Sequence, residues 1–322
     1  RERHVYVTNA ANSISIFMMG TDGSLTPYGV PQAQTGKGPS GLITDPSGKY
    51  LYVINAADNN IWLYNISQVS GYPVHVTNAN VGTGSGPANI AMTPSGQYVY
   101  VANNADGTVS EYAVTTNGFL TPIGVISAGT NPISIAVDPT GKYAYVANAG
   151  TNNVSQYLIG NNGVLSRMTP STIAVNSLHP NSIAIDPSGK YAYVVTSGTV
   201  AQFTIGSSGA LTPMSVAEVG GGISPSDIDI DSSGRYAYVP YALGVAKYDI
   251  SSNGQLIRTN TQSVKFYPSK MVIDPDGSIY SANEKNNSVS KFDVVGDGSI
   301  VPALGGVSIG SAPISITTDA VR

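Results

Sequence analysis

The sequence contains no cysteine, and only 11% of its 322 residues are charged. Without cysteine the chain has no disulfides, no thiolate nucleophile and no cysteine metal ligands, so its stability must come from packing and backbone pairing. The formal net charge is −4 and the pI about 5.2, which leaves no basic surface for nucleic acid or anionic lipid. No apolar run approaches the roughly 18 residues that span a bilayer. We therefore expect no nucleic-acid partner and no membrane insertion.

Residues that usually carry metal or nucleophilic chemistry are also scarce. The three histidines, His4, His75 and His179, are far apart and form no metal-binding pair. The segment 227–231 (Asp-Ile-Asp-Ile-Asp) lacks the Gly and the Glu that a calcium loop requires at fixed positions. No Gly-x-Ser-x-Gly elbow and no phosphate-binding loop is present. We expect no metal and no cofactor.

An internal repeat organises the whole chain. A segment of the form Pro-x-x-(Ile/Leu/Met)-x-x-Asp recurs at intervals of 43 to 48 residues, with Thr93 in place of Asp in the second copy. In most copies the Asp opens a Gly turn that leads into a Tyr-rich stretch, as in Asp138-Pro-Thr-Gly-Lys-Tyr143, which is typical of a hairpin. The copies begin at Pro39, Pro87, Pro132, Pro180, Pro225, Pro268 and Pro313.

A third stretch of each repeat places a β-branched residue three positions before an aromatic one. A fourth stretch often opens with Gly-x-Leu-Thr-Pro, as at Gly118 to Pro122. Four short strands in every 40 to 50 residues, repeated around a ring, are the signature of a β-propeller. The third-stretch pairs are Ile14 and Phe17, Ile61 and Tyr64, Val109 and Tyr112, Val154 and Tyr157, Val200 and Phe203, Val245 and Tyr248, and Val289 and Phe292.

The two ends of the chain complement each other. After Pro313 only the first strand of a repeat follows, whereas residues 4–9 match the second strand of the other repeats. We therefore predict one all-β domain over residues 1–322, a seven-bladed propeller with four antiparallel strands per blade. The inner strands begin near residues 39, 87, 132, 180, 225, 268 and 313. The C-terminal inner strand pairs with the N-terminal strands, which closes the ring and removes two exposed sheet edges.

The motifs also carry a family resemblance. Val5-Tyr6-Val7-Thr8-Asn9 and its counterparts, such as Tyr100-Val101-Ala102-Asn103, resemble the YVTN repeat family. The Asp-Pro-Ser-Gly-Lys-Tyr turns and the Gly-x-Leu-Thr-Pro segments resemble bacterial lactonase-type seven-bladed propellers, which are related to 6-phosphogluconolactonase and the carboxymuconate cyclases. The resemblance covers the full chain and implies the propeller fold and lactone hydrolysis. The His, Glu and Arg constellation expected of the carboxymuconate branch has no match here.

A residue that occurs in every repeat meets a need that every repeat shares, so we interpret these residues as structural. The turn Asp residues are expected to accept backbone N–H groups in Asx turns. The Asn residues that end the second strand, such as Asn148, are expected to bond locally. The Tyr rows are expected to pack between blades with their hydroxyls bonded.

Function is expected where the repeat is broken, and the breaks cluster in three consecutive units. The loops before Pro180, Pro225 and Pro268 depart from the Gly-rich pattern, and the Asn that ends the second strand is replaced by Thr196 and Tyr241. Opposite charges, Asp227 and Lys270, stand two residues after the motif Pro only in this sector. The alternative interpretation is neutral divergence of repeats. The hypothesis is a polar pocket at the mouth of the central channel, lined by His179, Asp227, Asp229, Tyr241, Tyr267 and Lys270.

Two function classes remain open from the sequence. Low charge and abundant Asn, Ser, Thr and Gly favour an exported or cell-envelope binding or scaffold module that takes a small molecule, a glycan or a protein at the channel mouth. The alternative is a lactonase-like hydrolase that opens a sugar or carboxylic-acid lactone. Such a reaction needs a cationic anchor and a general base, and Lys270 with His179 or Asp229 could supply them.

Overall fold

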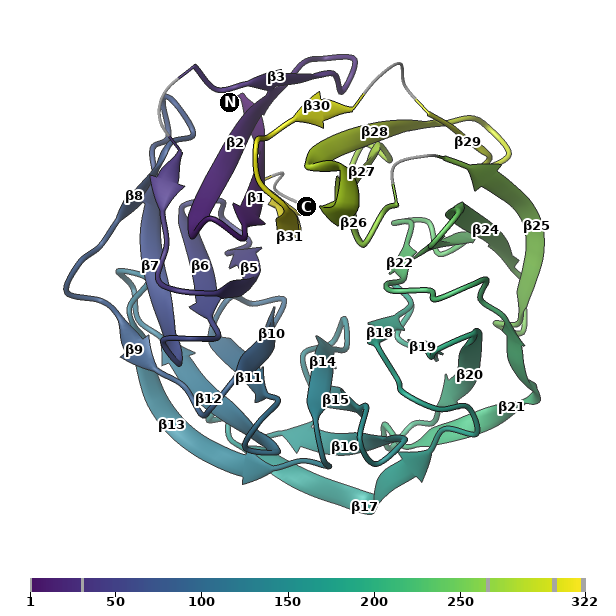
Figure 1. The fold of residues 1–322 in the computed structure, drawn as a ribbon. Helices are drawn as coiled ribbons and strands as arrows, with labels where there is room; N and C mark the ends of the chain where they lie inside the picture. Colours follow the sequence, from purple (N-terminus) through teal and green to yellow (C-terminus); the bar gives the residue numbers. More distant parts are fainter. Residues whose placement is uncertain (1, 30–31, 265–266, 303–305, 320–322) are drawn as a thin grey trace.

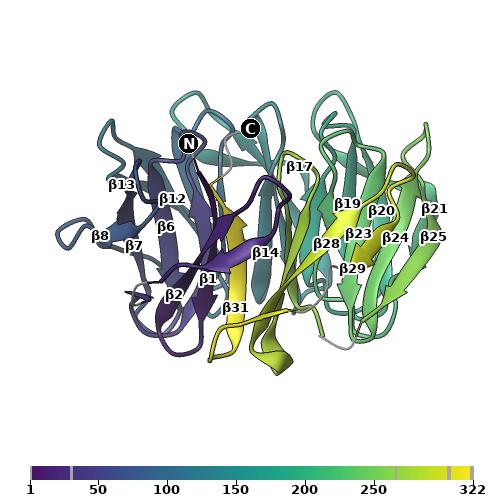
Figure 2. The same ribbon diagram turned by 90° about the horizontal axis from the view of Figure 1, so that it is seen from above.

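Seven antiparallel sheets are arranged as blades around a central axis, each with four main strands and three of them with one further short strand (Figure 1). The computed structural model describes residues 2–29, 32–264, 267–302 and 306–319. In each sheet one edge strand lies at the axis and the other edge lies at the rim, and Figure 2 shows the ring from the side. Within the described residues we find no helix capable of spanning a bilayer. The predicted fold class is confirmed.

Blades 1 to 6 follow one another along the chain, each with its strands in sequence order from axis to rim. In blades 1 and 6 the outermost strand is split into two short pieces. The strands are β5 (Pro39–Thr44), β6 (Tyr50–Asn55), β7 (Asn60–Ile66), β8 (Pro73–His75) and β9 (Val81–Gly82) in blade 1; β10 (Pro87–Met92), β11 (Tyr98–Asn103), β12 (Thr108–Val114) and β13 (Leu120–Ser127) in blade 2; β14 (Pro132–Val137), β15 (Tyr143–Asn148), β16 (Asn153–Ile159) and β17 (Leu165–Ala174) in blade 3.

The remaining strands are β18 (Ser182–Ile185), β19 (Tyr191–Val195), β20 (Thr199–Ile205) and β21 (Leu211–Gly220) in blade 4; β22 (Asp229–Ile230), β23 (Tyr236–Tyr241), β24 (Gly244–Ile250) and β25 (Leu256–Ser263) in blade 5; β26 (Lys270–Ile273), β27 (Ile279–Asn283), β28 (Ser288–Val294), β29 (Ile300–Pro302) and β30 (Val307–Ser308) in blade 6. A short 3-10 helix, η1 (Glu284–Asn286), connects β27 to β28. The inner strands of blades 4 to 6 begin at Ser182, Asp229 and Lys270, later than in the other blades.

Blade 7 closes the ring as predicted. Its inner strand is β31 (Pro313–Thr318), and its other strands are β1 (Arg3–Asn9), β2 (Ser13–Met19), β3 (Leu25–Pro27) and β4 (Ala33–Gln34). β31 pairs antiparallel with β1, with Val7 opposite Ile316. Next to this pairing His4 Nδ1 lies 3.1 Å from Asp319 Oδ2, and both side chains are only 1% exposed. The two ends of the chain are therefore joined by a backbone ladder and by a buried polar contact.

The hydrophobic core lies between the blades. Seven clusters of buried side chains each combine the facing surfaces of two neighbouring sheets, and together they follow the ring. The second-strand Tyr in every blade is buried there, and its hydroxyl donates to a Gly carbonyl of the next blade. The predicted packing of this Tyr row is confirmed. The seven bonds join Tyr6 to Gly71, Tyr52 to Gly118, Tyr100 to Gly163, Tyr145 to Gly209, Tyr193 to Gly254, Tyr238 to Gly298 and Tyr280 to Gly23.

The repeated polar residues have the structural roles expected of them. Asp138 accepts the backbone N–H groups of Thr140, Lys142 and Tyr143 at 3.0, 2.8 and 2.7 Å. Asn148 Nδ2 donates to Ser155 Oγ at 2.9 Å. These contacts hold the turns within a blade, so the repeated Asp and Asn residues build the fold.

Except for Gly23, the glycines that receive the Tyr bonds also leave room for a second aromatic ring. Gly163 has φ +80, and a Cβ built on it would lie 2.1 Å from the Tyr98 ring of the preceding blade. We predict that Gly163→Ala destabilises the protein by about 2–4 kcal/mol, because positive φ and overpacking both oppose a methyl group. Thermal unfolding of the variant measures this loss of stability. Gly296→Ala is the control, since nothing lies within 4 Å of its added Cβ. Equal melting temperatures for the two variants would contradict the prediction.

One buried carboxylate joins two blades and lowers stability while it is ionised. Glu111, 1% exposed, accepts the Leu165 backbone N–H at 2.9 Å. Burial raises the pKa of its carboxyl, although the bond from Leu165 opposes the shift. The equivalent side chains in the next two blades are neutral: Gln156 and Gln202 accept the N–H groups of Leu211 and Leu256.

We predict that Glu111→Gln raises the melting temperature at pH 7. The folded protein holds this proton more tightly than the unfolded chain, so the stability linked to protonation is present at low pH and is lost as the pH rises through the folded pKa. The gain is expected at pH 7, where the carboxylate is ionised, and it should shrink as the pH falls toward about 4, the ordinary Glu value. Melting curves between pH 4 and 8 measure it. A gain that is the same at all pH values would contradict this account.

Candidate functional site

Charge is almost absent from the inner strands, and it is concentrated in two adjacent blades. From each motif Pro to the fifth residue after it, the seven blades carry only three charged side chains, Asp227, Asp229 and Lys270. Asp227 and Asp229 belong to blade 5, and Lys270 begins β26 of blade 6. The inner wall of the ring is thus neutral except for this group of residues.

Asp227 connects three blades. Its Oδ1 accepts the Ser182 hydroxyl of blade 4 at 2.7 Å and lies 3.3 Å from Lys270 Nζ of blade 6. Its Oδ2 accepts the Met271 backbone N–H at 3.2 Å. The side chains of Asp227 and Lys270 are 15% and 34% exposed. The structure therefore brings this predicted pair together as an ion pair that solvent can reach.

Asp229 lies two residues further along the chain and begins the inner strand β22. Its Oδ2 accepts the Ile273 backbone N–H of blade 6 at 3.1 Å, and the residue is half-buried. This bond ties β22 to β26, so Asp229 helps to position the strand that carries Lys270.

Within the described residues, none of the remaining predicted side chains is hydrogen-bonded to this pair. His179 and Tyr267 are exposed and directly precede the motif Pro, each with positive φ, +54 and +50. Tyr241 is 6% exposed in the core between blades 4 and 5, with the Arg258 guanidinium 5.6 Å from its ring centre. Tyr241 stands at the position where other blades have the Asn that ends the second strand. A Tyr ring is larger than the Asn side chain that bonds to the third strand there. The Tyr241 ring therefore packs in the core between blades 4 and 5.

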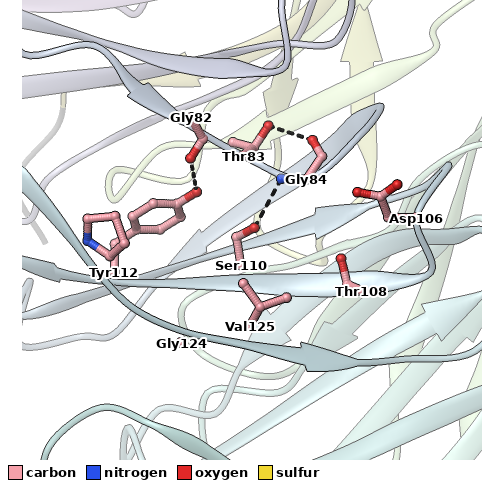
Figure 3. A pocket seen from close by; sticks show the side chains of 10 residues that line it. Gly82, Thr83, Gly84, Asp106, Thr108, Ser110, Tyr112, Gly124 and Val125 are labelled. Carbon is pink, nitrogen blue, oxygen red and sulfur yellow. Dashed lines mark hydrogen bonds between the residues drawn. The ribbon is translucent and has the colours of Figure 1, made fainter.

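A hollow that the sequence did not indicate lies on the opposite side of the ring. It has a volume of about 430 Å³ between blades 1 and 2, and Figure 3 shows Tyr112 bonded to the Gly82 carbonyl within it. A second hollow of about 420 Å³ adjoins it toward blade 3. Asp106 is the one charged residue lining each, and its Oδ2 already holds the Ser85 N–H. Neither hollow has a cation among its lining residues, so neither suits an anionic ligand.

The Asp227–Lys270 pair has the chemistry for hydrolysis of an ester-like bond. A carboxylate that solvent reaches can accept a proton from water, and a nearby ammonium can stabilise an oxyanion. Among the described residues no cluster of three metal-ligating side chains occurs. In the described part of the chain no histidine contacts Ser182, so this serine lacks the base that would activate it as a nucleophile.

Comparison with solved structures shows the same fold. A Bacteroides fragilis protein provisionally described as a 6-phosphogluconolactonase is 22% identical, covers 98% of each chain and has a TM-score of 0.88. PpgL, a periplasmic gluconolactonase of Pseudomonas aeruginosa, is 21% identical over 100% of each chain, with a TM-score of 0.85. A search of curated proteins gives no significant match.

The family model described as "Lactonase, 7-bladed beta-propeller" matches residues 1–83, 72–179 and 134–312. This match overturns the expectation of a binding or scaffold module as the main function, and it favours the alternative of a lactone hydrolase. The expectation was wrong because it was drawn from composition, which many propellers share whatever their chemistry. The chain belongs to the family of seven-bladed β-propeller lactonases.

Proposed function

We propose that the protein hydrolyses the lactone of a sugar acid at the Asp227–Lys270 pair. The observation that carries the proposal is that Asp227 and Lys270, two of the three charged side chains in the segments that follow the motif Pro, lie 3.3 Å apart in a chain of the lactonase family. The similar structures named as 6-phosphogluconolactonase and gluconolactonase support the substrate class.

In the proposed reaction Asp227 acts as general base. Its carboxylate takes a proton from a water molecule, whose oxygen bonds to the lactone carbonyl carbon. Lys270 stabilises the negative charge that develops on the carbonyl oxygen. The ring C–O bond then breaks, and the proton on Asp227 passes to the departing ring oxygen, which gives an open hydroxy acid. Ser182 and the Met271 N–H hold the carboxylate in place.

A panel of lactones tests the proposal. Glucono-δ-lactone, its 6-phosphate, galactono-γ-lactone and a simple δ-valerolactone would be incubated with the protein, and acid release would be followed with the spontaneous rate subtracted. We expect turnover of at least one sugar lactone and little turnover of δ-valerolactone, which lacks the hydroxyl groups of a sugar. No rate above the spontaneous one for any sugar lactone would contradict the proposal.

We also propose an exported location, on the composition of the chain and on the similarity to PpgL, which is named as periplasmic. Fractionation of native cells followed by immunoblotting tests it. Recovery outside the cytoplasm is the expected result, and recovery in the cytoplasmic fraction alone would contradict it.

A further inference from the structure

A left-handed residue stands directly before the motif Pro in six blades. Glycine or asparagine, which accept this conformation readily, fills three of the positions. His179, Ser224 and Tyr267 fill the other three, where positive φ costs a side chain about 1–2 kcal/mol. The φ values are +64 at Gly38, +63 at Gly86, +53 at Asn131, +54 at His179, +50 at Ser224 and +50 at Tyr267.

A side chain at this position meets the second residue after the Asn that ends the second strand of the same blade. A Cβ added to Gly38 would lie 3.1 Å from Ala57 Cβ, and one added to Gly86 would lie 3.1 Å from Ala105 Cβ. In blade 6 the corresponding two residues are Tyr267 and Lys285, and the Lys285 Nζ lies 5.1 Å from the centre of the Tyr267 ring. Blades 1 and 2 thus have a Gly–Ala pair where blade 6 has an aromatic ring and a cation.

The Tyr267–Lys285 pair is open to solvent. Tyr267 is 42% exposed and Lys285 is exposed. No carboxylate of the described residues lies within ion-pair distance of the Lys285 ammonium. Tyr267 also precedes Lys270 by three residues, so the pair belongs to the blade that carries the proposed anchor.

We propose that Tyr267 and Lys285 form an outer subsite that determines specificity for lactones bearing an anionic substituent. The inference rests on the function proposed for Asp227 and Lys270. The exposed face of the Tyr267 ring packs against the substrate, and the Lys285 ammonium binds the anion by a charge-assisted hydrogen bond. The backbone strain at Tyr267 is retained because the ring is needed at this place.

The double variant Tyr267→Gly/Lys285→Ala tests the subsite, because it rebuilds in blade 6 the Gly–Ala pair of blades 1 and 2. Its melting temperature is expected to equal or exceed that of the wild type, since glycine relieves the positive φ. For 6-phosphoglucono-δ-lactone we expect KM to rise at least tenfold with kcat little changed. For glucono-δ-lactone we expect kcat/KM to stay within about threefold.

Three further variants separate the contributions of Tyr267 and Lys285 to KM. Lys285→Gln should raise KM for the phosphorylated lactone alone, and Tyr267→Phe, which keeps the ring, should resemble the wild type. Lys37→Gln is the control for loss of one exposed lysine, since Lys37 lies in the corresponding interblade loop of blade 1. If the wild type opens lactones and the double variant leaves both KM values unchanged, the subsite is overturned while the proposed function stands. If the wild type opens no sugar lactone, both fail.

Discussion

Asp227→Asn is expected to lower kcat/KM for the preferred sugar lactone by at least a hundredfold without unfolding the protein. A carboxamide cannot take the proton from water, and general-base catalysis contributes typically 10²–10⁴-fold. The amide oxygen can still accept the Ser182 hydroxyl or the Met271 N–H, so the inner strands stay connected. Initial rates and a melting curve for each variant measure the two effects separately.

Two further variants sharpen this test. Asp231→Asn makes the same chemical change in the same blade, at a turn Asp that accepts the Tyr236 N–H at 2.7 Å, and should lower stability while activity per folded molecule is kept. Lys270→Met removes the proposed oxyanion partner and should cost about 10²–10³-fold in kcat. Full activity in both Asp227→Asn and Lys270→Met would exclude the pair as the reaction site.

Deletion of residues 313–322 is expected to unfold the protein. It removes β31, and with it the ladder to β1 and the contact between His4 and Asp319. It also exposes the core clusters on both sides of blade 7, which include Ile316 and Leu42. A folded domain is more stable than its unfolded chain by only roughly 5–15 kcal/mol, so we expect that it cannot tolerate the loss of a whole inner strand. Far-UV circular dichroism and thermal unfolding measure the result.

A matched deletion and a rescue complete the experiment. Deletion of residues 320–322 leaves β31 in place and should keep the melting temperature close to that of the full chain. A synthetic peptide of residues 313–322, added to the shortened chain during refolding, is expected to restore part of the folded signal. A shortened chain that melts at the wild-type temperature would show that the ring does not depend on this closure.

The fold could be predicted from the sequence because every blade is built from the same strands, turns and interblade contacts. The turn Asp, the buried second-strand Tyr and the Gly opposite it recur in nearly every repeat at similar spacing, so a prediction made for one blade applies to the others. Closure followed from counting strands at the two ends. The structure differs from the prediction in blade 5. The Tyr241 ring packs in the interblade core, and the inner strand is only Asp229–Ile230.

The candidate site was predictable only in part. Asp227 and Lys270 stood out because the repeat made an isolated pair of opposite charges visible at equivalent positions, and the structure places them in contact. The positive φ of Tyr267 could be inferred only by aligning it with Gly38 and Gly86, whose conformation is itself not written in the sequence. The hollow at Asp106 had no sequence signal, since Gly and Thr line many loops.

The most direct test of the site assigned to Asp227 and Lys270 is a crystal structure with a slowly hydrolysed analogue, such as the lactam of the preferred sugar lactone. We expect its carbonyl oxygen within hydrogen-bond distance of Lys270 Nζ, and a water molecule bonded to Asp227 about 3–3.5 Å from the carbonyl carbon. The matching structure of Asp227→Asn should hold the ligand in the same place. An analogue bound instead in the hollow at Asp106, or away from blades 4 to 6, would contradict the assignment of the site.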